Sequence, residues 1–224
     1  MSLWTRLADT AQSIGSSLLS ILGSEDKPPE KTVAFTIGMI ALSAKMAKSD
    51  GVVTHDEVKA FEDVFQVPEN DKPAVERVFN LAKQDIAGFE SYAKRVAELF
   101  SGGAHTLENV LDGLFHIAKA DGVVHEGELL YLQRVSEIFG FKEKDFTRIR
   151  ARHVVIADDP YVVLGLPSDA SIATVKKQYR TLARELHPDK QVASGMPEEL
   201  VIIASDRLAR INAAYNEIVK GSAA

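Results

Sequence analysis

The sequence predicts an all-α protein, a helical bundle with an internal repeat followed by a C-terminal helical hairpin. Three observations support this fold class: a nearly continuous apolar run at residues 33–47, an eleven-residue motif that occurs twice, and C-terminal apolar residues that recur every three or four positions. Such steps place apolar side chains on one face of an α-helix. The chain has 224 residues, a net charge of −6 and no cysteine, which excludes disulfides and thiolate metal sites.

Residues 1–26 are predicted to form an N-terminal amphipathic helix, because their apolar residues follow a helical stripe. Charged and hydroxyl side chains interrupt this stripe, so it is no transmembrane span, and Asp9 breaks the apolar core that a secretory signal needs. Two interpretations stay open: a helix or extension packed on its own domain, and weak membrane-surface contact of residues 1–24 with Trp4 at the interface. Residues 27–31 contain two adjacent prolines and form a Pro-rich linker.

The apolar run at residues 33–47 is too short for an ordinary membrane span, so we interpret it as a buried central helix. The repeat follows directly, since residues 47–57 match residues 118–128 at an offset of 71, with seven of eleven positions identical. Each copy is predicted to be helix, tight turn and helix, with Gly51 and Gly122 in the left-handed conformation that ends a helix. Further helical patterns cover residues 73–84, 88–101 and 105–120.

Acidic residues of the repeat are candidates for a metal site. The four candidates, two in each copy, are Asp50, Glu57, Asp121 and Glu128. A calcium loop of the EF-hand kind needs oxygen ligands at alternate positions, where this motif has valines, so helix capping is the favoured interpretation. His55 and His125 do not occupy matching positions, which disfavours a zinc site. We therefore expect no cofactor.

The C-terminal hairpin is predicted from two apolar seams with three- and four-residue steps. They consist of Ile172, Val175, Tyr179, Leu182 and Leu186 in the first helix and Ala204, Leu208, Ile211, Tyr215 and Ile218 in the second. A short connection favours an antiparallel pair with the seams in contact. Asp159 followed by Pro160 is a predicted helix start, since proline is favoured at the first helical position.

Between the two helices lies His187-Pro188-Asp189, which we expect to stand rigidly in the loop at the hairpin tip, because proline restricts its own φ and the residue before it. The outer face of the first helix is basic. Lys176, Arg180 and Arg184 follow one another at four-residue steps, with Lys177 beside them. A basic face leading to a rigid polar tip indicates docking onto an acidic partner surface.

These residues resemble a J domain of the DnaJ family. The resemblance rests on residues 159–166, residues 175–183, His187-Pro188-Asp189-Lys190 and residues 211–215, in the family's order and spacing. Residues 32–145 resemble a TerB-like helical domain of pseudo-twofold character, through the doubled Lys-x-Asp-Gly-Val-Val-x-x-x-Glu pattern. Residues 146–158 then form a connecting helix or linker before the J domain at 159–224. A TerB-like domain followed by a J domain is the arrangement of DjlA-type co-chaperones.

The resemblance implies a DnaK-type (heat-shock-70) chaperone as partner, with ATP hydrolysis that the J domain stimulates. It implies His187, Pro188 and Asp189 as the essential contact residues and Lys176, Lys177, Arg180 and Arg184 as the docking face. The TerB-like domain would serve targeting or the binding of a client or partner. The alternative is a TerB-like adaptor or metal-responsive module in the stress response, with a weakly active J domain.

The sequence does not indicate an enzyme, since it has no cysteine nucleophile, no glycine-rich phosphate loop and no Gly-x-Ser-x-Gly elbow. Nucleic-acid binding is not expected, because the composition is not locally and strongly basic. We expect a cytoplasmic protein. A peripheral position at the inner membrane face and a homodimer through the TerB-like domain are left open.

Overall fold

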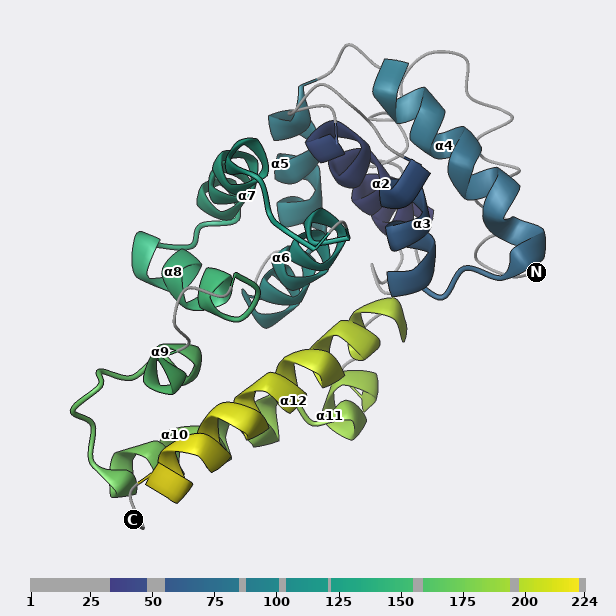
Figure 1. Ribbon diagram of the computed structural model, residues 1–224. Coiled ribbons are helices and arrows are strands. Elements are labelled where there is room, and N and C mark those ends of the chain that lie inside the picture. The colour runs from purple at the N-terminus through teal and green to yellow at the C-terminus, as the bar shows by residue number, and fades with distance from the viewer. Residues whose placement is uncertain are drawn as a thin grey trace. The chain divides into compact units, whose positions relative to one another are not determined.

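The computed structural model describes residues 33–47, 55–84, 88–100, 104–120, 122–154, 159–193 and 198–221, and every regular element in these ranges is a helix (Figure 1). The expected all-α class is therefore confirmed. The chain divides into two compact units, Met1–Gly140 and Phe141–Ala224. Within the described ranges, no helix is both long enough and apolar enough to cross a membrane. The predicted N-terminal helix and Pro-rich linker, residues 1–31, lie outside these ranges.

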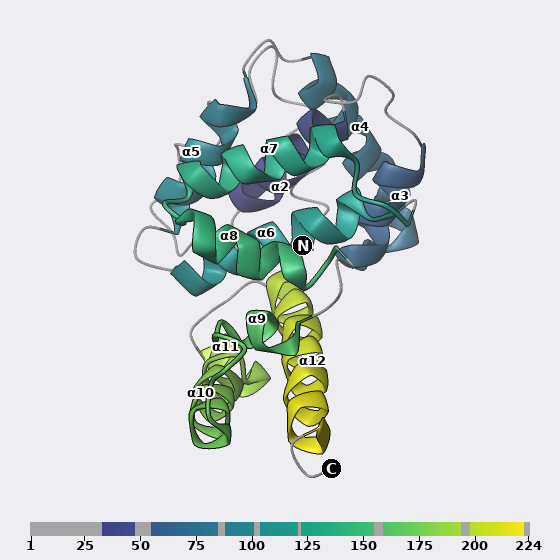
Figure 2. The same ribbon diagram turned by 60° about the vertical axis from the view of Figure 1, so that its left-hand side comes forward.

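The first unit is built around α2 (Val33–Ala47), as the apolar run predicts. Every described side chain of this helix is buried except Lys45, which is half-buried. Around α2 pack α3 (His55–Val64), α4 (Lys72–Gln84), α5 (Phe89–Leu99), α6 (Ala104–Ala118) and α7 (Glu126–Ile138), with a 3-10 turn at Glu69–Asp71 before α4. Both views show α2 enclosed by other helices (Figures 1 and 2). An apolar helix without a polar face is stable only inside such an enclosure.

The repeat corresponds to the helix pairs α2–α3 and α6–α7. In the second copy Gly122 has a φ of +100°, the left-handed conformation that the sequence predicts. Helix α7 then begins after His125, whose backbone N–H donates to Glu128 Oε2 at 2.8 Å. This bond satisfies a donor at a helix start, as in a capping box. The turn of the first copy, residues 48–54, lies outside the described residues.

Tyr131 links α7 to the central helix of the first unit. Its buried hydroxyl donates to the backbone carbonyl of Leu42 at 2.8 Å. Burial, together with the nearby Glu90 carboxylate, raises the pKa of Tyr131 well above its ordinary value of 10.0. The folded chain therefore holds this proton at pH values where the unfolded chain releases it, so unfolding becomes easier as the pH rises above about 10.

Tyr131→Phe is expected to lower the free energy of unfolding by about 1 kcal/mol near neutral pH, because it removes one buried hydrogen bond. It should also remove the part of the alkaline destabilisation that comes from this phenol. Urea unfolding of the wild type and the variant from pH 8 to pH 11 measures both effects. The two stabilities should converge as the pH rises, and a constant difference would contradict the assignment.

The second unit contains α8 (Glu143–Ala151), α9 (Pro160–Leu164), α10 (Ile172–Glu185), α11 (Pro188–Ala193) and α12 (Glu198–Gly221). Helices α10 and α12 lie side by side, and α9 packs against both (Figure 1). Helix α8 also packs against α9. The expected boundary between residues 145 and 146 falls inside α8, and the compact unit begins earlier, at Phe141.

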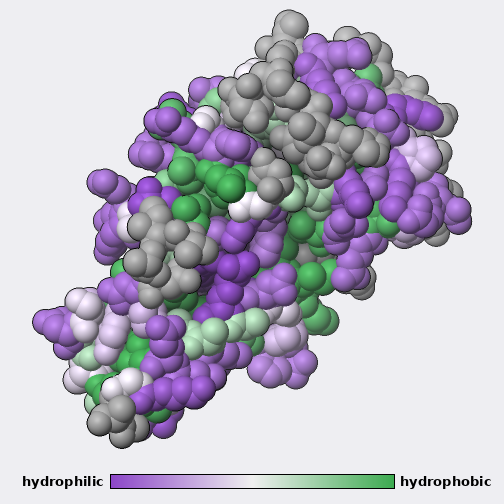
Figure 3. Space-filling model, in the orientation of Figure 1, coloured by the Kyte–Doolittle hydropathy of each residue, from purple (hydrophilic) through white to green (hydrophobic). Residues whose placement is uncertain are grey.

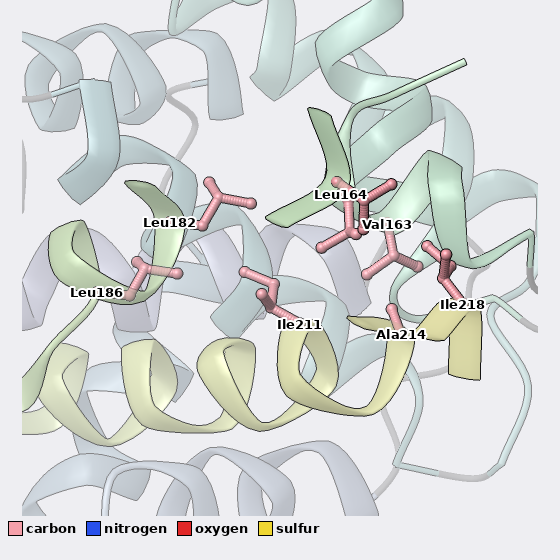
Figure 4. Packing of buried hydrophobic residues seen from close by; sticks show 8 residues of the cluster. Val163, Leu164, Leu182, Leu186, Ile211, Ala214 and Ile218 are labelled. Carbon is pink, nitrogen blue, oxygen red and sulfur yellow. The ribbon is translucent and has the colours of Figure 1, made fainter. Parts of the chain in front are cut away.

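The core of the second unit is the predicted pair of seams. Figure 4 shows Leu182 of α10, and Leu186 just after this helix, on the side of Ile211 of α12, with Val163 and Leu164 of α9 on the side of Ala214. The rings of Tyr179 and Tyr215 stack at the edge, with centroids 4.0 Å apart. The sequence places both tyrosines on the seams, and this pairing confirms that the seams meet. These apolar contacts fix the position of α10 relative to α12. They therefore also position the residues at the end of α10.

Candidate functional site

The candidate site lies where α10 ends and α11 begins. Helix α10 ends at Glu185, close to the predicted end, and Leu186 caps it with its N–H bonded to the carbonyl of Leu182. The side chains of His187 and Asp189 are 57% and 90% exposed. The backbone N–H of Asp189 donates to His187 Nδ1 at 3.2 Å, and the Asp189 carboxylate lies 3.6 Å from the same nitrogen. The tripeptide therefore presents an imidazole and a carboxylate together to the solvent.

The prediction of a loop at this position is wrong, because Pro188 opens the helix α11 (Pro188–Ala193). The carbonyl of His187 accepts hydrogen bonds from the N–H groups of Lys190 and Gln191, at 3.0 and 3.1 Å. Proline at the first helical position and an acidic residue in the first turn are typical of a helix N-terminus. These two features are the signal in the sequence that could have identified α11. The N-terminus of α11 thus adds backbone hydrogen bonds to the conformational restriction that proline imposes on the tripeptide.

The basic face of α10 has the exposure that the sequence predicts. Its four cations, Lys176, Lys177, Arg180 and Arg184, are all exposed, and the seam residues Val175 and Leu182 on the opposite side are buried. Three of the four follow at four-residue steps along one side of the helix, and Lys177 lies beside them. We call these four cations the basic row. The row ends one turn before His187. The basic row and the tripeptide therefore lie next to each other on the surface of the second unit.

Helix caps fix the elements that carry this surface. Asp159 caps α9 by accepting the N–H of Tyr161 at 3.0 Å, as predicted. Gly165 ends α9 with a φ of +71°. Ser171 starts α10 by accepting the N–H of Thr174 at 3.2 Å. These local bonds satisfy donors and acceptors at helix ends, which the apolar core cannot satisfy.

The metal candidates are only partly within the described residues. Asp50, Asp121 and the side chains of His55 and Glu57 lie outside them. Glu128 is 3% exposed and caps α7, so this carboxylate has a structural role of the kind that the sequence favours. Among the described residues, no group of three or more histidines and carboxylates could hold a metal ion.

On the face shown in Figure 3, hydrophobic residues lie in several separate areas between hydrophilic ones. This view therefore does not identify a single apolar surface as a candidate site. The tripeptide and the basic row are distinguished by their charge and exposure instead. An exposed row of cations beside a rigid polar tip can attract an acidic surface and make one specific contact there.

Comparison with protein families gives two matches. Residues 36–151 match the model of TerB, the tellurite resistance protein, and residues 159–220 match the DnaJ domain. The TerB match covers more than half of the chain and extends through α8. The DnaJ match begins at the cap of α9 and includes the tripeptide and the basic row.

Several curated proteins resemble the chain over most of its length, and each has the name co-chaperone protein DjlA. The protein from Photobacterium profundum is 27% identical over 85% of this chain and 79% of its own length. The one from Coxiella burnetii is 29% identical over 78% and 73%, and the one from Vibrio cholerae is 27% identical over 88% and 81%. No solved structure matches the chain.

Proposed function

This chain belongs to the TerB family and carries a DnaJ domain at residues 159–220, the organisation of a DjlA-type J-domain co-chaperone, and on this premise we propose that it docks on a DnaK-type chaperone and stimulates ATP hydrolysis there. The observation that carries the proposal is the joint exposure of His187, Asp189 and the basic row on one unit with a core of its own. DnaK docking and ATPase stimulation are general properties of J domains.

The basic row and the tripeptide would act in sequence. Lys176, Lys177, Arg180 and Arg184 steer the second unit onto an acidic surface of the DnaK-type chaperone, because opposite charges accelerate and orient encounter. His187, Pro188 and Asp189 then contact the chaperone near its interdomain linker. They favour the conformation that hydrolyses ATP by binding it more tightly than the alternative conformation. The chain itself hydrolyses nothing in this scheme.

The first unit would decide where the J domain acts. Its TerB domain would bind a client or a partner, and a homodimer through this domain would place two J domains in one assembly. Weak membrane-surface contact of residues 1–24 would keep a cytoplasmic protein at the inner membrane face. Sedimentation of the full chain and flotation with liposomes, with and without residues 1–24, test these two assignments separately.

The experiment that tests the proposed function is single-turnover ATP hydrolysis by purified DnaK with increasing amounts of the full chain. We expect the rate to rise and then reach a plateau. The plateau measures the action of the tripeptide, and the concentration at half-maximal stimulation measures docking. A rate that does not rise at any concentration would refute the proposal.

Reversing three charges of the basic row, Lys176→Glu, Arg180→Glu and Arg184→Glu, is expected to weaken docking strongly. Each exposed ion pair contributes little, but reversal adds repulsion to the loss, so the half-maximal concentration should rise roughly 10- to 100-fold. Added salt should weaken docking of the wild type and reduce this difference, because salt screens exposed charges. The same hydrolysis assay at two salt concentrations measures both effects.

A matched control reverses three exposed lysines elsewhere in the second unit, Lys142, Lys144 and Lys220. It changes the net charge by the same amount and leaves the basic row intact. Equal weakening by both triple variants would show that net charge is responsible and would contradict a docking role for the row.

A further inference from the structure

Helix α11 has an unusual buried residue. Gln191 is 5% exposed, although glutamine is mostly found at the surface and this helix has only six residues. Its side-chain amide donates to the backbone carbonyl of Glu185, the last residue of α10. That carbonyl is one of the acceptors that a helix leaves without an intrahelical donor at its end. Gln191, the fourth residue of α11, therefore joins this helix to the end of α10.

The same residue is also connected to His187. The backbone N–H of Gln191 donates to the His187 carbonyl at 3.1 Å, and the N–H of Asp189 donates to His187 Nδ1 at 3.2 Å. The two bonds of Gln191 thus hold the carbonyls of Glu185 and His187, one on each side of the turn between the helices. A six-residue helix is too short to be stable by itself, so its orientation depends on such tertiary contacts.

We propose that Gln191 is a positioning residue, which aligns the tripeptide with the basic row of α10 through its bond to the Glu185 carbonyl. This inference rests on the proposed function and deepens it. Without the bond, α11 can still form, but this hydrogen bond no longer fixes its orientation against the end of α10. The tripeptide then samples orientations that the DnaK-type chaperone does not bind, and only the aligned fraction of molecules is productive.

The test replaces Gln191 with a slightly shorter apolar side chain that cannot donate a hydrogen bond, Gln191→Leu, in the full chain. Losing a buried hydrogen bond and leaving a carbonyl without its partner should reduce the plateau of DnaK stimulation roughly tenfold. The half-maximal concentration should change less than about twofold, because the basic row carries the docking. The full wild-type plateau in the variant would overturn the inference.

Gln178→Leu is the matched control. The Gln178 amide also donates to a backbone carbonyl at a helix end, that of Leu164, at 3.2 Å, but it joins α9 to α10 and does not contact the tripeptide. We expect similar thermal destabilisation from both substitutions and a reduced plateau from Gln191→Leu only. An equal loss of plateau in both variants would show that Gln191 is merely structural.

A second readout does not depend on DnaK. The nitrogen NMR signals of the His187 imidazole should shift in Gln191→Leu and stay unchanged in Gln178→Leu. Of the two glutamines, only Gln191 is hydrogen-bonded to the turn that contains His187. If the wild type fails to stimulate DnaK, the proposed function fails while the His187 spectrum still tests the positioning role. An unchanged His187 spectrum in Gln191→Leu would refute that role independently.

Discussion

His187→Gln is expected to abolish most of the stimulation of DnaK while leaving the J domain folded. The His187 side chain is 57% exposed, so its replacement should change the free energy of unfolding by less than about 0.5 kcal/mol. Glutamine keeps an acceptor that can receive the Asp189 N–H, but it lacks the flat imidazole ring. A residue at the centre of a specific contact is worth about 2 kcal/mol or more, so the plateau of hydrolysis should fall roughly 30-fold or further.

His105→Gln is the matched control, because His105 is also an exposed histidine but belongs to α6 in the first unit. Single-turnover hydrolysis and thermal melting of both variants separate function from folding. We expect stimulation by the His105 variant to equal that of the wild type. Full stimulation by His187→Gln would contradict a role of the tripeptide in the mechanism. The basic row alone would then have to explain the stimulation.

The seams of the second unit could be predicted because they are long and periodic. Val175 and Leu182 of the first seam and Ile211 of the second belong to series with three- and four-residue steps, and all three are buried. The contribution of α9 to the same core could not be predicted from periodicity, since a helix of five residues is too short to show one. The local sign of α9 in the sequence is its predicted helix start, Asp159 followed by Pro160.

Helix α11 was missed for a related reason. Six residues do not display a helical period, and the proline that opens α11 is also typical of a turn. The bond from Gln191 to Glu185 joins residues six positions apart across a change of helix direction, and propensity gives no information about such a contact. The components of the candidate site were thus visible in the sequence, whereas the Gln191 hydrogen bond that we propose to orient them was not.

The central helix α2 could be predicted from the sequence, but its packing partners could not. Residues 33–47 were predicted as a buried helix because nearly all of them are apolar, and the structure confirms it. The same uniformity hides which neighbours pack on which side, because a helix that is apolar all round has no polar face to mark the solvent. Its packing partners, α3 to α7, become apparent only in the folded chain.

Ile211→Ala is expected to cause the largest loss of stability in the second unit. Ile211 is fully buried near the middle of α12, within the cluster that joins α12 to α10 and α9 (Figure 4). Removing its methyl and methylene groups costs their transfer free energy and leaves a cavity, together about 3–4 kcal/mol. A loss of this size raises the population of the opened unit more than roughly 100-fold. It is also a large part of the total stability of such a domain, which is only about 5–15 kcal/mol.

Hydrogen exchange of the α10 and α12 amides measures this change where it arises, since both helices lose protection when the cluster opens. Leu130→Ala serves as the control, because Leu130 is 63% exposed and its truncation should cost less than about 0.5 kcal/mol. DnaK stimulation by Ile211→Ala should fall with temperature in parallel with the lost protection, because the tripeptide and the basic row depend on these two helices for their positions. Unchanged exchange in α10 and α12 would show that the cluster does not hold the candidate site together.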